Sequence, residues 1–144
     1  MATGKLFGLF FMSLGNKLMD LDSDDMRVSL HTSTYTPNQD THDFFDDATN
    51  EVVGTGYTAG GVALTGETMA YNAGSNTWTL DANDAQWPSS TITARYAVVY
   101  DRTPATDATR PLVGYQDFVT DAASAAGLFE IVWNAGGIVS VVVA

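Results

Sequence analysis

The sequence predicts an all-β fold: an antiparallel β-sandwich or barrel-like sheet pair of about seven to eight short strands, with one or two short helices. The longest strand signal is TITARYAVVYD, residues 91–101. Its first half alternates polar and apolar residues, and its second half is apolar on both parities, as in a strand covered on one face and then on both. β-Branched and aromatic residues dominate it, which places it centrally in a sheet.

The second observation is that short apolar segments recur at about 10-residue spacing, separated by turn residues. The other expected strands are residues 26–33, 62–64, 67–72, 77–81, 112–119, 128–133 and 138–143. Residues 72–76 (NAGSN) are a typical hairpin turn, and residues 120–126 are expected to form a small-residue turn. The last two strands are expected to pair with each other across residues 134–137.

Alternation within these strands also predicts the core. The residues expected to be buried are Ile92, Tyr96, Val98, Leu112, Phe118, Phe129, Ile131 and Trp133. Trp78 lies in a strand pattern and is also expected in the core. Trp87 stands beside Pro88 in an expected turn, which makes it the best candidate for an exposed aromatic residue and hence for contact with a sugar.

The N-terminal segment is expected to differ from the rest. We divide the chain into an apolar arm, residues 1–17, and a single β-sandwich domain, residues 18–144. The apolar residues after Lys5 resemble a short signal peptide, but their spacing also fits a short helix, and we expect a structured arm. One further helical turn is expected over residues 42–48, with acidic residues near its positive end.

Composition narrows the classes of function. The 144 residues suit one domain, and the absence of Cys excludes disulfides and Cys-ligated zinc. Six Lys and Arg against seventeen Asp and Glu give a formal net charge of −11. This charge argues against nucleic-acid binding and against docking on anionic membranes. It is compatible with high solubility, a partner that has a basic patch, or cation binding.

Two acidic segments invite a metal interpretation. Residues 20–25 (DLDSDD) begin like a calcium loop, but Asp25 stands where an EF-hand has Gly, and His31 stands where it has Glu. We expect a solvated turn here, with an improvised oxygen site as the alternative. His42 lies among acids in residues 40–47, and we expect a structural or exposed His beside helix-capping acids, with a metal site as the alternative.

No motif predicts an enzyme or a cofactor. The serines lack a nucleophile elbow, and the glycines of residues 54–61 (GTGYTAGG) match neither the phosphate-binding loop nor the dinucleotide fingerprint. With seventeen acidic residues, any pair of carboxylates can be proposed as a glycosidase site, so no single pairing is informative. We therefore expect no catalytic, cofactor-binding or metal residues.

Three segments carry a family resemblance. They are residues 18–64, with the pieces TPNQDTHDFFDD and NEVVGTGYTAGG, then residues 91–101 and residues 111–118 (PLVGYQDF). The chain resembles a group of small tailed-bacteriophage virion structural proteins of the head decoration, or cement, kind. The resemblance implies a non-enzymatic protein that is made in the host cytoplasm and binds the major capsid protein on the capsid surface. It also implies a homo-oligomer, with a trimer favoured, and it offers no catalytic residues.

Partner binding is predicted for the arm, because many large apolar side chains near a chain terminus should be covered. The candidate residues are Phe7, Leu9, Phe10, Phe11 and Leu14. Either a capsid or a second copy covers them, or the domain's own core does. A competing function is a tail-associated adhesion domain that recognises host surface glycan through exposed aromatics. A third is a calcium-dependent extracellular binding module.

Overall fold

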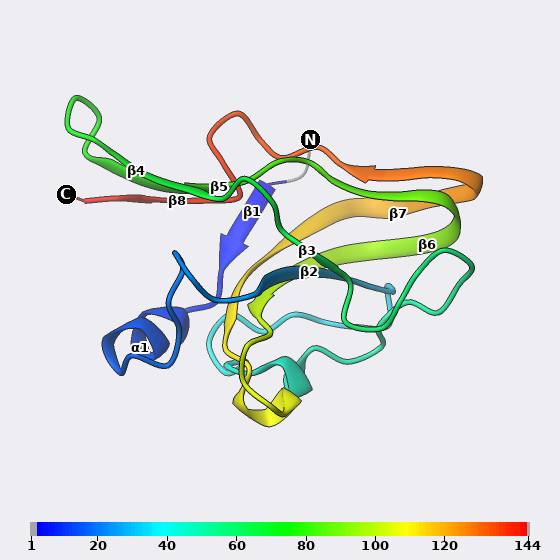
Figure 1. Ribbon diagram of the computed structural model, residues 1–144, viewed down its shortest axis with the longest axis horizontal. Helices are drawn as coiled ribbons and strands as arrows, with labels where there is room; N and C mark the ends of the chain where they lie inside the picture. The colour runs from blue at the N-terminus through cyan, green and yellow to red at the C-terminus, as the bar shows by residue number, and fades with distance from the viewer. Residues whose placement is uncertain (1–2, 144) are drawn as a thin grey trace.

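The computed structural model describes residues 3–143 and contains two antiparallel sheets (Figure 1). The larger sheet has the strand order β1-β7-β6-β2-β3, and the smaller has the order β4-β5-β8. The strands are β1 (Thr3–Leu6), β2 (Met26–His31), β3 (Val62–Ala63), β4 (Thr68–Asn72), β5 (Thr77–Asp81), β6 (Ala85–Asp101), β7 (Leu112–Ile131) and β8 (Val139–Val142). The helical segments are α1 (Phe10–Gly15), η1 (Phe45–Asp47) and η2 (Asp107–Thr109). The predicted all-β class is confirmed.

Strands β6 and β7 form a long bent hairpin that organises the fold (Figure 1). Their pairing register shifts at four points, and positive φ angles at Ser89, Val119 and Ala126 mark local bends of the two strands. The turn predicted for residues 120–126 is wrong, because these residues continue β7 opposite β6. Small residues there permit close pairing but give no apolar alternation, so the strand pattern is hidden.

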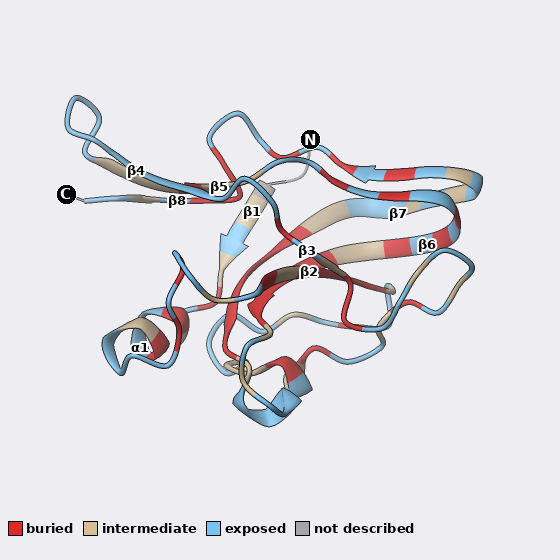
Figure 2. Cartoon of the chain, in the orientation of Figure 1, coloured by how far each residue is buried: buried red, intermediate tan, exposed pale blue. Residues whose placement is uncertain are grey.

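The prediction for residues 91–101 is confirmed in detail. Exposed Thr91 and Thr93 alternate with buried Ile92 and Ala94, whereas all five residues 97–101 are buried. At this end β6 lies between β7 and β2, and apolar residues cover both faces of the sheet. Figure 2 shows buried stretches on β6 and β7 that are interrupted by exposed ones.

A long connection after β2 covers one of these faces. The ring of Phe45 in η1 stacks on Tyr100 of β6, with centroids 3.9 Å apart. The connection returns to the sheet at Gly61, whose φ of +72° and close approach to the carbonyl of Val28 leave no room for a side chain. The predicted helical turn over residues 42–48 is present as the single 3₁₀ turn of η1.

The smaller sheet departs from the predicted pairing. β8 pairs with β5, opposite residues 77–80, and not with residues 128–133. Buried Leu80 and Val139 anchor the sheet to the main core. The distal halves of its strands project away from the body, together with the β4–β5 turn, and are mainly exposed (Figure 2).

Most of the predicted core is confirmed, and one aromatic prediction is wrong. The buried residues of the predicted set are Ile92, Val98, Leu112, Phe129, Ile131 and Trp133, while Tyr96 and Phe118 are half-buried. Trp78, also expected in the core, is half-buried. Trp87, expected to be exposed, is only 2 % exposed and packs edge-on against Phe129. The expected turn at Pro88 lies within β6, in a part that pairs with β7 but not with β2. Pro is tolerated there because one side of the strand needs no ladder hydrogen bond.

Candidate docking groove

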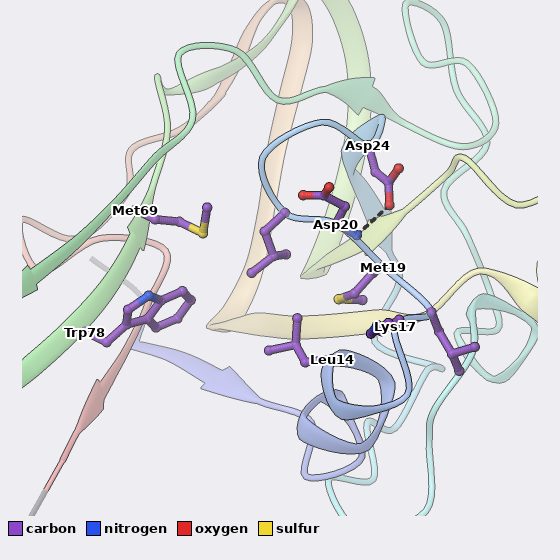
Figure 3. A pocket seen from close by; sticks show the side chains of 9 residues that line it. Leu14, Lys17, Met19, Asp20, Asp24, Met69 and Trp78 are labelled. Carbon is purple, nitrogen blue, oxygen red and sulfur yellow. Dashed lines mark hydrogen bonds between the residues drawn. The ribbon is translucent and has the colours of Figure 1, made fainter.

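A groove of about 690 Å³ lies between two parts of the chain that are far apart in sequence. One wall is formed by the end of α1 and the loop after it, and the other by the face of β4 and β5 (Figure 3). The lining residues are Leu14, Lys17, Leu18, Met19, Asp20, Leu21, Asp24, Met69 and Trp78. Apolar side chains form most of both walls, and three charged residues stand among them.

The helix-side wall is positioned by the way α1 ends. Lys17 adopts a left-handed φ of 57°, and the N–H of Leu18 donates to the carbonyl of Ser13 over 2.9 Å. This tight turn resembles the closing bonds that commonly end helices. It sends the chain back beside the helix, so that Leu14 and Leu18 face the same space, with Leu18 47 % exposed.

The sheet-side wall follows from strand register. Tyr71 pairs with Trp78, and Trp78 pairs with Val141, so these three side chains form one row across β4, β5 and β8. Met69 lies on the same face, next to buried Leu80. Met69 and Trp78 extend toward the groove in Figure 3. The sheet therefore presents an incompletely covered apolar face beyond the point where it is anchored.

The acidic loop at the groove is held by hydrogen bonds from its own backbone N–H groups to its carboxylates. A carboxylate oxygen of Asp20 accepts the N–H of Asp22 over 3.0 Å, and Asp24 accepts the N–H of Asp20 over 2.6 Å. The hydrogen bond from the Asp22 N–H, together with that from Ser23, lowers the pKa of Asp20. These carboxylates therefore serve a solvated turn, and within residues 3–143 no group of three or more His, Cys, Asp or Glu side chains is arranged to hold a metal ion.

A buried carboxylate lies behind this loop. Asp101, at the end of β6, is fully buried, and its Oδ1 accepts the N–H of Thr103 over 2.8 Å. Its Oδ2 has no hydrogen-bond partner among the described atoms. Burial raises the pKa of Asp101, and the neighbouring carboxylate of Asp24 raises it further. Asp101 thus favours the protonated form more than an exposed Asp does.

The two histidines belong to the core face and not to the groove. His31 is fully buried between two partners, Ser29 Oγ at 2.9 Å from Nε2 and the Thr49 carbonyl at 2.8 Å from Nδ1. Burial lowers the pKa of His31 to about 4. A Ser–His contact of this kind is the start of a nucleophilic site, but here both side chains are closed off from solvent. His42 Nδ1 lies 3.0 Å from the hydroxyl of Tyr35 and does not join the surrounding acids in a metal site.

The structure separates the five predicted partner-binding residues. Phe7 and Phe10 are buried in the fold, because β1 pairs with β7 and carries the segment onto the core. The domain's own core therefore covers these two side chains, which is the alternative given in the sequence analysis. Phe11 is 50 % exposed on α1, whereas Leu9 and Leu14 are half-buried. Of the five, Leu14 lines the groove.

Sequence reasoning missed the opposite wall of the groove. Met69 and Trp78 share a face in the predicted hairpin, which was a usable signal, but nothing local indicates that this face meets α1.

No helix among residues 3–143 is long and apolar enough to span a membrane. Comparison with protein-family models, with curated proteins and with solved structures gave no match.

Proposed function

We propose that this protein is a non-enzymatic phage virion structural protein that binds the head shell as a decoration, or cement, protein. The observation that carries the proposal is the partly open apolar groove on a strongly acidic chain. The similarity of residues 18–64, 91–101 and 111–118 to small phage virion proteins supplies the biological setting. In this proposal the partner is the major capsid protein.

The groove suits attachment for physical reasons. Leu18 and Met69 each leave a large part of their surface in water, and covering a large apolar side chain fully contributes about 1.5–3 kcal/mol. Asp20 and Asp24 beside them favour an occupant that carries Lys or Arg next to its apolar residues. The partner expected from this chemistry is an apolar capsid segment with a basic flank.

Co-sedimentation with purified, undecorated capsids tests the proposal. We expect Leu18→Ser and Met69→Ser to weaken capsid binding at least about tenfold while leaving the thermal midpoint close to that of the wild type. The matched control is Val53→Ser, because Val53 is 98 % exposed and lies outside the groove. Capsid binding that is equally strong in all three variants would overturn the role of the groove.

One observation favours a second candidate, a tail-associated adhesion domain. Tyr71 and Trp78 are cross-strand neighbours, and Tyr71 is 56 % exposed, so they offer an aromatic platform of the kind on which sugar rings stack. Trp87, by contrast, is buried and unavailable. Because the other two tryptophans are buried, quenching of exposed tryptophan fluorescence by host glycan would report on Trp78. Such quenching, together with placement at the tail, would favour adhesion over decoration.

A further inference from the structure

The outer edge of β8 offers unpaired backbone groups in a defined pattern. The N–H of Val143 donates to the carbonyl of Asn76 over 2.7 Å, so that residue faces β5. Backbone direction alternates along a strand, so Val141 also faces β5, whereas the N–H and C=O groups of Ser140 and Val142 point away from it. Within residues 3–143 no strand pairs with this side of β8.

Hydrogen-bond geometry defines what fits this edge. Unpaired N–H and C=O groups at strand spacing are satisfied by another extended strand, and an uncharged edge without Pro is a template for such pairing. Val142 is 67 % exposed, and its neighbour Val143 is 53 % exposed. The part of the strand beyond buried Val139 is therefore open to an added partner.

Charge distinguishes the candidate partners. The chain has a net charge of −11, yet residues 131–143 contain no ionisable side chain. Within β4, β5 and β8 the only ionisable groups are Asp81, at the anchored end, and the hydroxyl of Tyr71. A basic partner would gain nothing here and would be drawn to the acidic loops instead. A second copy of the chain, itself strongly acidic, is repelled elsewhere and meets the least repulsion at this neutral edge.

We propose that two copies of this chain pair antiparallel through β8 about a two-fold axis centred on Val141. In this register Ser140 of each copy lies opposite Val142 of the other, and these two pairs exchange about four main-chain hydrogen bonds. The two Val141 side chains meet across the axis as a pair without hydrogen bonds between them. The three-stranded sheets join into one sheet, and the row of Tyr71, Trp78 and Val141 continues across both copies.

The proposed contact is isologous, meaning that both copies use the same surface, and this determines the number of copies in the oligomer. Pairing of a strand with itself closes at two copies, as is usual for two-fold contacts, and does not by itself generate the trimer that the family resemblance implies. The edge is short, so the dimer should be weak and concentration-dependent. Added salt should strengthen it, because salt screens the repulsion between two acidic copies.

Cysteine cross-linking of the purified protein tests the register. The chain has no Cys, so Val141→Cys introduces a single thiol at the proposed axis, where the facing Cβ atoms of such a pair lie close enough for a disulfide. We expect mild oxidation to convert this variant into a covalent dimer, at a rate at least about tenfold above that of Val53→Cys, an exposed control outside the sheet. Equal cross-linking rates for the two variants would overturn the proposal.

Sedimentation velocity provides a second test that needs no new thiol. Val142→Pro removes an outward N–H without breaking the β5–β8 ladder, whereas Val142→Thr keeps that N–H. We expect the proline variant to weaken dimerisation about tenfold and the threonine variant to leave it nearly unchanged. A wild-type protein that is monomeric at all concentrations, or purely trimeric, contradicts the inference. Neither test involves capsids, so both are independent of the proposed function.

Discussion

The buried histidine makes the stability of the fold depend on pH in a predictable way. His31 has a pKa of about 4 in the folded chain, against 6.5 for an ordinary His, because burial disfavours the charged ring. When folding lowers the pKa of a base, the folded chain has its full stability at pH values above the pKa of that base in the unfolded chain. This stability is lost as the pH falls toward the pKa in the folded chain. Between pH 7.5 and pH 5 the unfolded chain takes up a proton at this position and the folded chain does not.

The magnitude follows from linkage. Each pKa unit corresponds to about 1.36 kcal/mol, and the lowering of the pH from 6.5 to 5 spans about one and a half units, so His31 costs about 2 kcal/mol of unfolding free energy at pH 5. Carboxylates elsewhere also titrate, and their effect must be removed. His31→Asn does this, because it keeps a polar side chain but has no proton to gain in this range.

Urea denaturation of both proteins at pH 7.5 and pH 5 measures the effect. We expect the unfolding free energy of the wild type to fall by about 2 kcal/mol more than that of His31→Asn. Chemical shifts of the His31 ring provide a direct second reading and should stay constant until the pH is well below 6.5. Parallel pH dependence of the two proteins, within about 0.5 kcal/mol, would refute the reasoning.

Three further variants test the packing. Asp101→Asn should raise the unfolding midpoint at neutral pH and lose that advantage in acid. The pKa of buried Asp101 is raised, which means that its charged form, present at high pH, destabilises the fold. An unchanged midpoint at pH 7 would contradict this. Phe129→Ala should cost about 3–5 kcal/mol in urea, since Phe129 packs against Trp87, and a loss below about 0.5 kcal/mol would count against its burial. Gly61→Ala should cost more than about 1 kcal/mol, because its φ is +72° and a methyl group would meet the Val28 carbonyl; wild-type stability would show that the backbone relaxes.

Local pattern predicted the central part of the fold well. In residues 91–101 the alternation of polar and apolar residues predicts which side chains are buried, and in residues 72–76 Gly and Asn predict the turn. Both features could therefore be predicted without knowledge of the tertiary contacts. The exposure of Trp87 was mispredicted because Pro88 suggests a turn, whereas the bent β6 accommodates it without one. The pairing of β8 with β5 depends on which strands the folded core brings together, and no local pattern encodes that.

The candidate groove was predictable only in part. The arm was recognised as a segment whose apolar side chains must be covered, but its residues divide between the core and the surface. Phe7 and Phe10 pack inward because β1 joins the sheet, and Leu14 remains at the groove. The other wall comes from Met69 and Trp78, more than fifty residues away in the chain. When a site is formed by two segments that are distant in the chain, the spacing of its residues in the sequence does not indicate that they meet.

A cryo-EM reconstruction of the intact virion tests the proposed attachment most directly. The account predicts many copies of this chain on the head surface, each with the groove between α1 and the β4–β5 hairpin facing the shell, and an apolar capsid segment near Leu18 and Met69. Density confined to the tail, or copies on the head whose grooves face solvent, would contradict it.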